Sequence, residues 1–106
     1  MSKTFEINGK TYKAAPFNYN LMCEFEERGL PIEQINEKPF LFIRTYFAVS
    51  GRFKNASLAG KELEDHIEKG GDFADIMEAM NDAMESSGFF QMLTNNQTNE
   101  NPEDED

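Results

Sequence analysis

The stretch that decides the fold is residues 39–51, which read PFLFIRTYFAVSG and are apolar on nearly every side. Only Arg44, Thr45 and Ser50 are strongly polar within it. A helix without a polar face is normally surrounded by protein. A buried strand would also suit the aromatic and β-branched content, but the length and the proline and glycine boundaries favour a helix. The sequence therefore predicts a buried central helix that begins at its proline and is capped by its glycine.

The N-terminal segment carries the signal of a β-hairpin. Asn8 and Gly9 stand between two short segments in which apolar and polar residues alternate. An Asn-Gly pair flanked in this way is typical of a tight hairpin turn. We expect strands at residues 3–7 and 10–14. A lone hairpin is only marginally stable in water, so its apolar face should lie on the helices.

Two helical segments are predicted before the central helix. Asn18 can cap the first through its side-chain oxygen, and Gly29 is placed to end it. Pro31 blocks continuation and can open a short helical turn. The apolar side chains of both segments are expected to face the core: Leu21, Met22, Phe25, Ile32 and Ile35.

Two amphipathic helices are predicted after the central helix. Ser57 can cap the first, which Gly70 and Gly71 stop. Asp72 can cap the second, which ends at Gly88. The residues expected on the inward faces are Leu58, Ala59, Leu63 and Ile67 in the first of these helices and Phe73, Ile76, Met77, Met80 and Met84 in the second.

The chain is expected to form one domain followed by a tail. Its 106 residues suffice for a single core, and its 39% apolar content is concentrated in ten Phe and six Met. From Thr94 onward there is no aliphatic or aromatic residue except the ring of Pro102, so this segment cannot offset its ordering entropy. The predicted class is α+β, mainly α, with an N-terminal hairpin packed on four to five helices in residues 1–93 and a disordered acidic tail in residues 94–106.

The charge of the chain argues against several partners. Its net charge is −10, which opposes non-specific attachment to nucleic acid or to an anionic membrane. No stretch approaches the roughly 18 apolar residues of a membrane span. Cys23 is the single cysteine, so no internal disulfide is possible and a reducing compartment is expected. We predict a protein that stays in the cytosol and binds neither nucleic acid nor membrane.

Residues suited to chemistry are sparse. His66 is the only histidine, and Glu62 and Asp65 beside it fall short of the three or four convergent ligands that a metal needs. Neither a calcium-loop spacing nor a glycine-rich phosphate loop occurs. Serine, cysteine and histidine are too few to indicate nucleophilic catalysis. The sequence predicts no enzyme, no cofactor and no metal.

Two apolar features could carry binding to a partner. Met77, Met80 and Met84 form a stripe of flexible side chains that suits adaptable surfaces, with core packing as the alternative. Phe89 and Phe90 precede the tail, where they either close the core or remain available to a partner. We predict these five residues as the partner-binding residues.

The chain carries a family resemblance in five of its segments. They are the hairpin TFEINGKTY at 4–12, FNYNLMCEFEERG at 17–29, the apolar helix ending near Gly51, EKGGDF at 68–73 and GFF at 88–90. In this order and spacing, over residues 4–93, they resemble the tail assembly chaperones of long-tailed phages and prophages.

The resemblance implies a mostly helical, non-structural assembly factor in the cytoplasm of the host bacterium, absent from the mature virion. Such chaperones coat the tape measure protein, keep it soluble and help to recruit tail tube subunits. A homo-oligomer is expected, and many relatives also have a longer product made by ribosomal frameshifting. No catalytic residue or cofactor is implied.

Two alternatives stay open at this point. One is an acidic phage or bacterial inhibitor that mimics nucleic acid, which would need dense carboxylates on the folded body. Five of the negative charges instead lie in the last seven residues, 100–106. The other is a minor structural tail protein, which mass spectrometry of purified particles would detect.

Overall fold

A hairpin and a set of short helices make up the described part of the chain. The computed structural model describes the backbone of residues 3–99 and the side chains of residues 3–93. The elements in chain order are β1 (Thr4–Ile7), β2 (Lys10–Lys13), α1 (Tyr19–Glu27), the 3-10 helix η1 (Ile32–Gln34), α2 (Pro39–Ser50), α3 (Ala56–Glu68), α4 (Ala74–Ser86) and α5 (Gly88–Asn99). The predicted class, mainly helical with an N-terminal hairpin, is confirmed.

The central position predicted for α2 is confirmed. Tyr46 and Phe47 are fully buried, and Gly51 occupies the C-cap. The Tyr46 ring stacks on Phe17, with 5.4 Å between ring centroids, and the Phe47 ring meets Tyr12 edge-on at 4.8 Å. Aromatic contacts therefore tie α2 both to the hairpin and to the linker that leads into α1.

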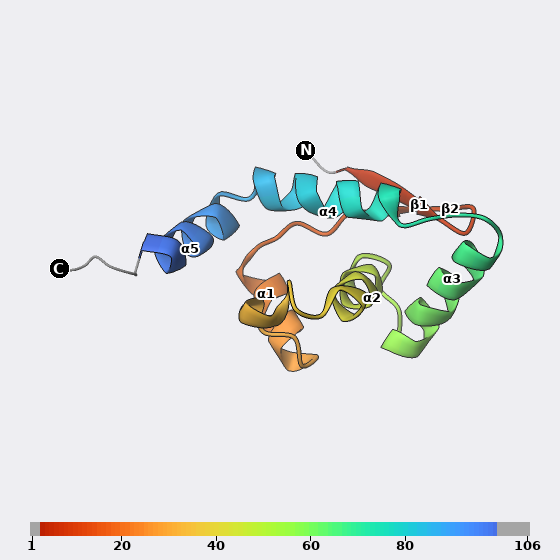
Figure 1. Ribbon diagram of the computed structural model, residues 1–106, viewed down its shortest axis with the longest axis horizontal. Coiled ribbons are helices and arrows are strands. Elements are labelled where there is room, and N and C mark those ends of the chain that lie inside the picture. The colour runs from red at the N-terminus through yellow and green to blue at the C-terminus, as the bar shows by residue number, and fades with distance from the viewer. Residues whose placement is uncertain (1–2, 100–106) are drawn as a thin grey trace.

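The hairpin has the predicted turn. Asn8 and Gly9 both have positive φ, 55° and 79°, which is the backbone that a two-residue turn matching the strand twist requires. The strands pair antiparallel with Phe5 opposite Tyr12, and each is one residue shorter at its outer end than predicted. Phe5 and Ile7 are buried. In Figure 1 the hairpin lies alongside α4, and α1 and α2 are drawn below α4 in this view.

Of the predicted helix caps, Asn18 is confirmed and Ser57 is wrong. Asn18 caps α1 as expected, because its Oδ1 accepts a hydrogen bond from the Leu21 N–H at 2.9 Å. Ser57 was the wrong cap for α3. Asn55 caps that helix by accepting from the Leu58 N–H at 3.0 Å, so α3 begins before Ser57. Asparagine is as good a cap as serine, so the residue type of Asn55 was a signal that the sequence analysis did not use.

The other ends differ from the prediction by one or two residues. Phe73 occupies the N-cap position of α4, yet the Asp72 side chain still accepts from the first helical N–H, that of Ala74, at 3.0 Å. Gly88 does not end α4, which stops at Ser86. It is instead the first residue of α5.

Part of the predicted tail is described only as backbone. α5 extends to Asn99, but side chains from Thr94 onward and residues 100–106 lie outside what the structure describes. The prediction of a disordered tail, and with it the boundary at residue 93, stays a prediction.

Tyr46 gives the fold a measurable dependence on alkaline pH. Its hydroxyl donates to the Ala15 carbonyl at 2.6 Å. Burial raises the pKa of Tyr46 to about 12, although a hydrogen bond with Ser50 acts in the opposite direction. In the unfolded chain the tyrosine pKa is near 10, so the unfolded chain loses the Tyr46 proton at a lower pH than the folded chain does. The contribution of Tyr46 to the free energy of unfolding is therefore complete below pH 10 and falls as the pH rises towards 12.

We predict that Tyr46→Phe lowers the free energy of unfolding by about 1–3 kcal/mol at neutral pH, because the Ala15 carbonyl loses its donor. Above pH 10 the free energy of unfolding should fall less steeply with pH in this variant than in the wild type. The pH dependence that remains comes partly from Tyr12, whose pKa is raised by burial and by Glu62. Urea denaturation at several pH values measures both effects. Tyr19→Phe is the control, since Tyr19 is exposed. Equal pH slopes for wild type and Tyr46→Phe would contradict the assignment.

Candidate functional site

An apolar groove lies between the first half of α2, one face of α3 and the segment that enters α4. Its volume is about 440 Å³. Apolar side chains form its walls and charged side chains stand at its rims. We call it the α2–α3 groove. Its walls are Phe40, Ile43, Leu63, Ile67 and Phe73, and its charged residues are Arg44, Glu64 and Glu68.

The groove exists because α2 is not covered along its whole length. Phe42 and Phe47 lie in the core, but Phe40, in the first turn, is 79% exposed. Burying a phenylalanine contributes about 1.5–3 kcal/mol, so a partner that covers an exposed one can gain this free energy on binding. A large exposed apolar side chain next to other apolar side chains is typical of an interaction site.

The α3 wall follows helical spacing. Gly60, Leu63 and Ile67 recur three and four residues apart, which places them on one face of the helix. Gly60 contributes no side chain, and a Cβ there would come within 3.4 Å of the Arg44 Cδ. Glycine inside a helix costs about 1 kcal/mol relative to alanine. That separation is an ordinary van der Waals contact, so alanine would fit at this position and would make a more stable helix.

Ile67 and Leu58 correct a prediction. Both were expected to face the core with Ala59 and Leu63, but Leu58 is 49% exposed and Ile67 is 42% exposed. α3 is buried through Ala59 and Leu63 alone. Ile67 shares a face with Leu63 but lies beyond the part of α3 that the core covers, so it lines the groove instead. Leu58 lies outside the groove.

The rims of the groove carry unequal charge. Arg44 belongs to α2, whereas Glu64 and Glu68 belong to α3. The ion pairs found among residues 3–93 involve other side chains, so these three charges are not neutralised within the part of the chain that the structure describes. A partner with basic residues beside an apolar surface would complement the α3 rim.

The five predicted partner-binding residues do not form one surface. Met77 is 46% exposed and follows Phe73 by one helical turn, so it adjoins the groove. Met80 and Phe90 are buried in the core, and Met84 is half-buried against it. Phe89 is exposed at the other end of α4. The stripe is therefore divided between core and surface, and sequence reasoning missed Phe40 because the whole of its helix was expected to be buried.

A second exposed apolar surface involves α5. Tyr19, Phe89 and Met92 are exposed, and the Tyr19 and Phe89 rings meet edge-on with 5.9 Å between centroids. We call these three residues the α5 patch. The helix itself, GFFQMLTNNQTN, contains no charged residue.

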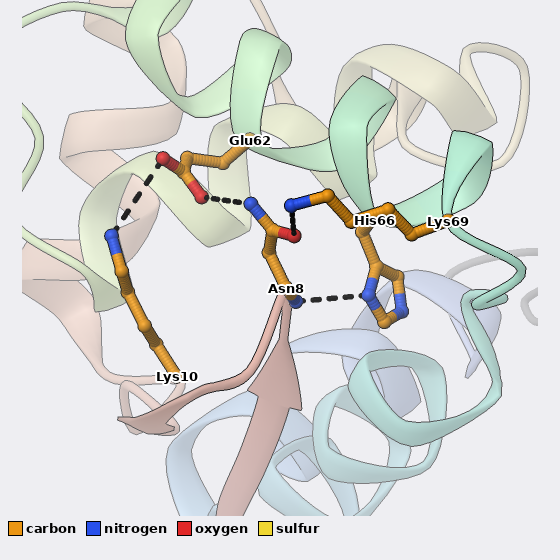
Figure 2. Close-up of polar contacts among 5 residues, drawn as sticks. All are labelled: Asn8, Lys10, Glu62, His66 and Lys69. Atoms are coloured by element: carbon orange, nitrogen blue, oxygen red, sulfur yellow. Dashed lines mark hydrogen bonds and ion pairs between the residues drawn. The ribbon is translucent and has the colours of Figure 1, made fainter.

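His66 belongs to a polar cluster that joins the hairpin turn to α3 (Figure 2). The backbone N–H of Asn8 lies 2.9 Å from His66 Nδ1, and His66 Nε2 lies 2.9 Å from the Asp72 carbonyl oxygen. An amide N–H only donates, so Nδ1 is the acceptor and Nε2 carries the proton that it donates to Asp72. His66 thus fastens the hairpin turn and the α3–α4 connection to each other.

The Asn8 side chain completes this cluster. Its Nδ2 donates to Glu62 Oε1 at 3.0 Å, and its Oδ1 accepts from Lys69 Nζ at 3.2 Å. Lys10 Nζ lies 3.8 Å from Glu62 Oε2 (Figure 2). Within the described part of the chain, no group of three or more potential ligands is arranged to hold a metal ion. The cluster is accounted for by its structural role.

Comparisons with protein-family models, with curated proteins and with solved structures find no match to this chain. Among the helices that the structure describes, none is long and apolar enough to cross a membrane. The function must therefore be inferred from the groove, the α5 patch and the sequence.

The fit around His66 predicts the effect of a small substitution. A Cβ at Gly71 would overlap the His66 ring, which hydrogen bonds hold on both sides. We expect Gly71→Ala to lower the free energy of unfolding by about 1–3 kcal/mol, because the ring must shift and lose a hydrogen bond. Urea denaturation measures the change. Gly88→Ala is the control, since nothing lies within 4 Å of its Cβ position, and equal losses in the two variants would refute the steric explanation.

The exposure of Phe40 predicts a second result. We expect Phe40→Asp to change the free energy of unfolding by less than about 0.5 kcal/mol, as exposed positions usually do, and to reduce the fluorescence of a bound apolar dye. Leu58→Asp is the matched control, because Leu58 is an exposed apolar residue of α3 outside the groove. If both variants reduced dye binding equally, the groove would not be the apolar site.

Proposed function

We propose that this chain is a tail assembly chaperone of a long-tailed phage or prophage. It binds the tape measure protein, keeps it soluble and helps to recruit tail tube subunits in the cytoplasm of the host, and it is absent from the finished virion. The sequence resemblance over residues 4–93 supports this proposal, and so does a mainly helical fold. The observation that carries it is the α2–α3 groove.

The groove suits an amphipathic helix. Two helices form its walls, its interior is apolar and its charges stand at the edges. A helical partner presents apolar residues at three- and four-residue spacing with polar residues on either side, which complements such a groove. Phe40 can enter between apolar side chains of the partner, and Met77 beside the groove can adapt to different ones. A long helical tape measure protein would offer many such segments.

The charge of the chain suits a solubilising role. A net charge of −10 keeps copies bound along an aggregation-prone partner in solution. Glu64 and Glu68 favour partner segments with basic residues beside the apolar stripe. The proposal is a binding role without catalysis, metal or cofactor.

Co-expression with the tape measure protein from the same genome tests the proposal. We expect that protein to be insoluble alone and to be soluble and co-purified with the wild-type chain. Phe40→Asp and Ile67→Asp should lower the recovered complex at least about tenfold, as loss of a central anchor does. Leu58→Asp should not. A tape measure protein that is soluble alone and forms no complex would refute the proposal.

A further inference from the structure

A second cleft lies between the end of β2, the second half of α1 and the end of α2, and its volume is about 810 Å³. Its charged side chains are Lys13, Glu24, Arg28 and Arg52. The chain as a whole has twenty acidic and ten basic residues, yet basic side chains outnumber acidic ones in this cleft by three to one. We call it the basic cleft. It shares no residue with the α2–α3 groove.

The basic side chains of this cleft are available to a ligand. Lys13 and Arg52 are exposed, and neither takes part in the ion pairs found among residues 3–93. Arg28 lies 3.7 Å from Glu24, one helical turn before it. An ion pair of this kind at the surface contributes little, so Arg28 can exchange Glu24 for another carboxylate. The cleft therefore offers three positive charges to an anionic ligand.

Arg52 stands where the backbone favours glycine. Gly51 caps α2, and Arg52 directly after it has a positive φ of 58°. The Phe53 N–H donates to the Ala48 carbonyl at 3.0 Å, which closes the common helix-ending motif whose left-handed residue is usually glycine. A side chain at such a position costs conformational energy. An arginine there, beside two other basic side chains, is better explained by a ligand than by stability.

The chemistry of the cleft suits a peptide with several carboxylates. Guanidinium groups bind carboxylates through paired hydrogen bonds, and a lysine adds a further positive charge. Ala14, Ala15 and Ala48 line the cleft with small side chains, which leave room for a peptide backbone. The space is also larger than one small anion needs. Arginine clusters recognise acidic peptide motifs in this way.

The chain itself contains a segment of matching chemistry. Residues 100–106 read ENPEDED and carry five acidic side chains, and no other stretch of seven residues in the sequence carries as many. We infer that the segment 100–106 of one copy binds the basic cleft of a second copy. The contact pairs the most acidic stretch of the sequence with a cleft in which basic side chains predominate.

The direction of α5 favours a second copy over the same chain. α5 is about 18 Å long and leads away from α1 and α2 in Figure 1. Its Phe89 contacts Tyr19, the first residue of α1, whereas the basic cleft lies at the other end of α1. Seven extended residues span at most about 25 Å. A segment that begins beyond α5 would have to recover the lengths of both helices to reach its own cleft, and a second copy imposes no such limit.

The contact joins two different surfaces, so it is heterologous and builds open chains or rings rather than two-fold dimers. A segment of seven residues buries less than the roughly 1,200 Å² of a stable interface, so association should be weak and reversible. The inference requires neither the α2–α3 groove nor a tape measure protein.

Sedimentation velocity of the full-length chain and of two charge-reversed variants tests the inference. The cleft variant carries Lys13→Glu and Arg52→Glu. The segment variant carries Glu103→Lys, Asp104→Lys, Glu105→Lys and Asp106→Lys. Wild type should grow in size with concentration, and each variant alone should associate at least about tenfold more weakly, because like charges then meet. An equal mixture of the two variants should associate again, because each segment then finds a cleft of opposite charge.

Recovery in the mixture is the decisive result. Both variants keep a net negative charge, so overall attraction between them cannot produce it. A monomeric wild type, a cleft or segment variant that assembles like wild type, or a mixture that does not recover would each overturn the inference. Urea denaturation checks that each variant is folded, which is expected because Lys13 and Arg52 are exposed.

Lys38→Glu combined with Lys61→Glu is the matched control for the cleft variant. It changes the net charge by the same amount, and both lysines are exposed and lie outside the basic cleft. This control should assemble like wild type. A loss equal to that of the cleft variant would show that net charge, and not the cleft, governs association.

Arg52→Gly separates binding from stability. Glycine adopts a positive φ without strain, so this variant should unfold at a higher urea concentration than wild type. It should nevertheless associate more weakly, because the cleft loses one of its positive charges. Association at the wild-type level would contradict the role assigned to Arg52.

Salt dependence distinguishes this contact from an apolar one. Added salt should weaken association, because it screens exposed opposite charges. Association strengthened by salt would indicate an apolar contact and would overturn the inference. The proposed function can be judged separately, since all of these variants keep Phe40 and the α2–α3 groove and should still solubilise a tape measure protein.

Discussion

The packing of Tyr46 and Phe47 inside the fold is the interaction on which the rest depends. A helix that is apolar on nearly all sides must be covered on nearly all sides. Tyr46 contacts Phe17 in the linker to α1, Phe47 contacts Tyr12 of the hairpin, and α3 and α4 pack on the remaining faces. The hairpin and the surrounding helices are thus arranged so that they cover the apolar sides of α2.

The same requirement explains where the surface is apolar. The neighbouring elements do not cover the first turn of α2, so Phe40 in that turn is exposed and lines the groove between α2 and α3. A charged residue at position 40 would suit an exposed first turn better than phenylalanine does, and alanine would suit the α3 helix better than Gly60 does. Both positions depart from what stability alone favours, and both lie in the groove. Departures of this kind concentrate at binding sites.

Much of the fold could be predicted from local signals. The Asn8 and Gly9 turn, the Asn18 cap and the boundaries of α2 each follow from the chemistry of a few neighbouring residues. Periodicity was less informative about burial. It placed Ile67 on the face of Leu63 and Met77 on the face of Met80, but it does not show how far along a face the neighbouring element reaches. The division of the predicted partner-binding residues between core and surface, with Met80 and Phe90 inside, depends on that tertiary information.

The central claim is that Phe40 and its groove receive a helix. A photo-crosslinking amino acid placed at position 40, in cells that make the chain with and without the tape measure protein, tests this most directly. The account predicts crosslinks to the tape measure protein when it is present. An absence of crosslinks from position 40, or the same crosslinks from position 58, would contradict it.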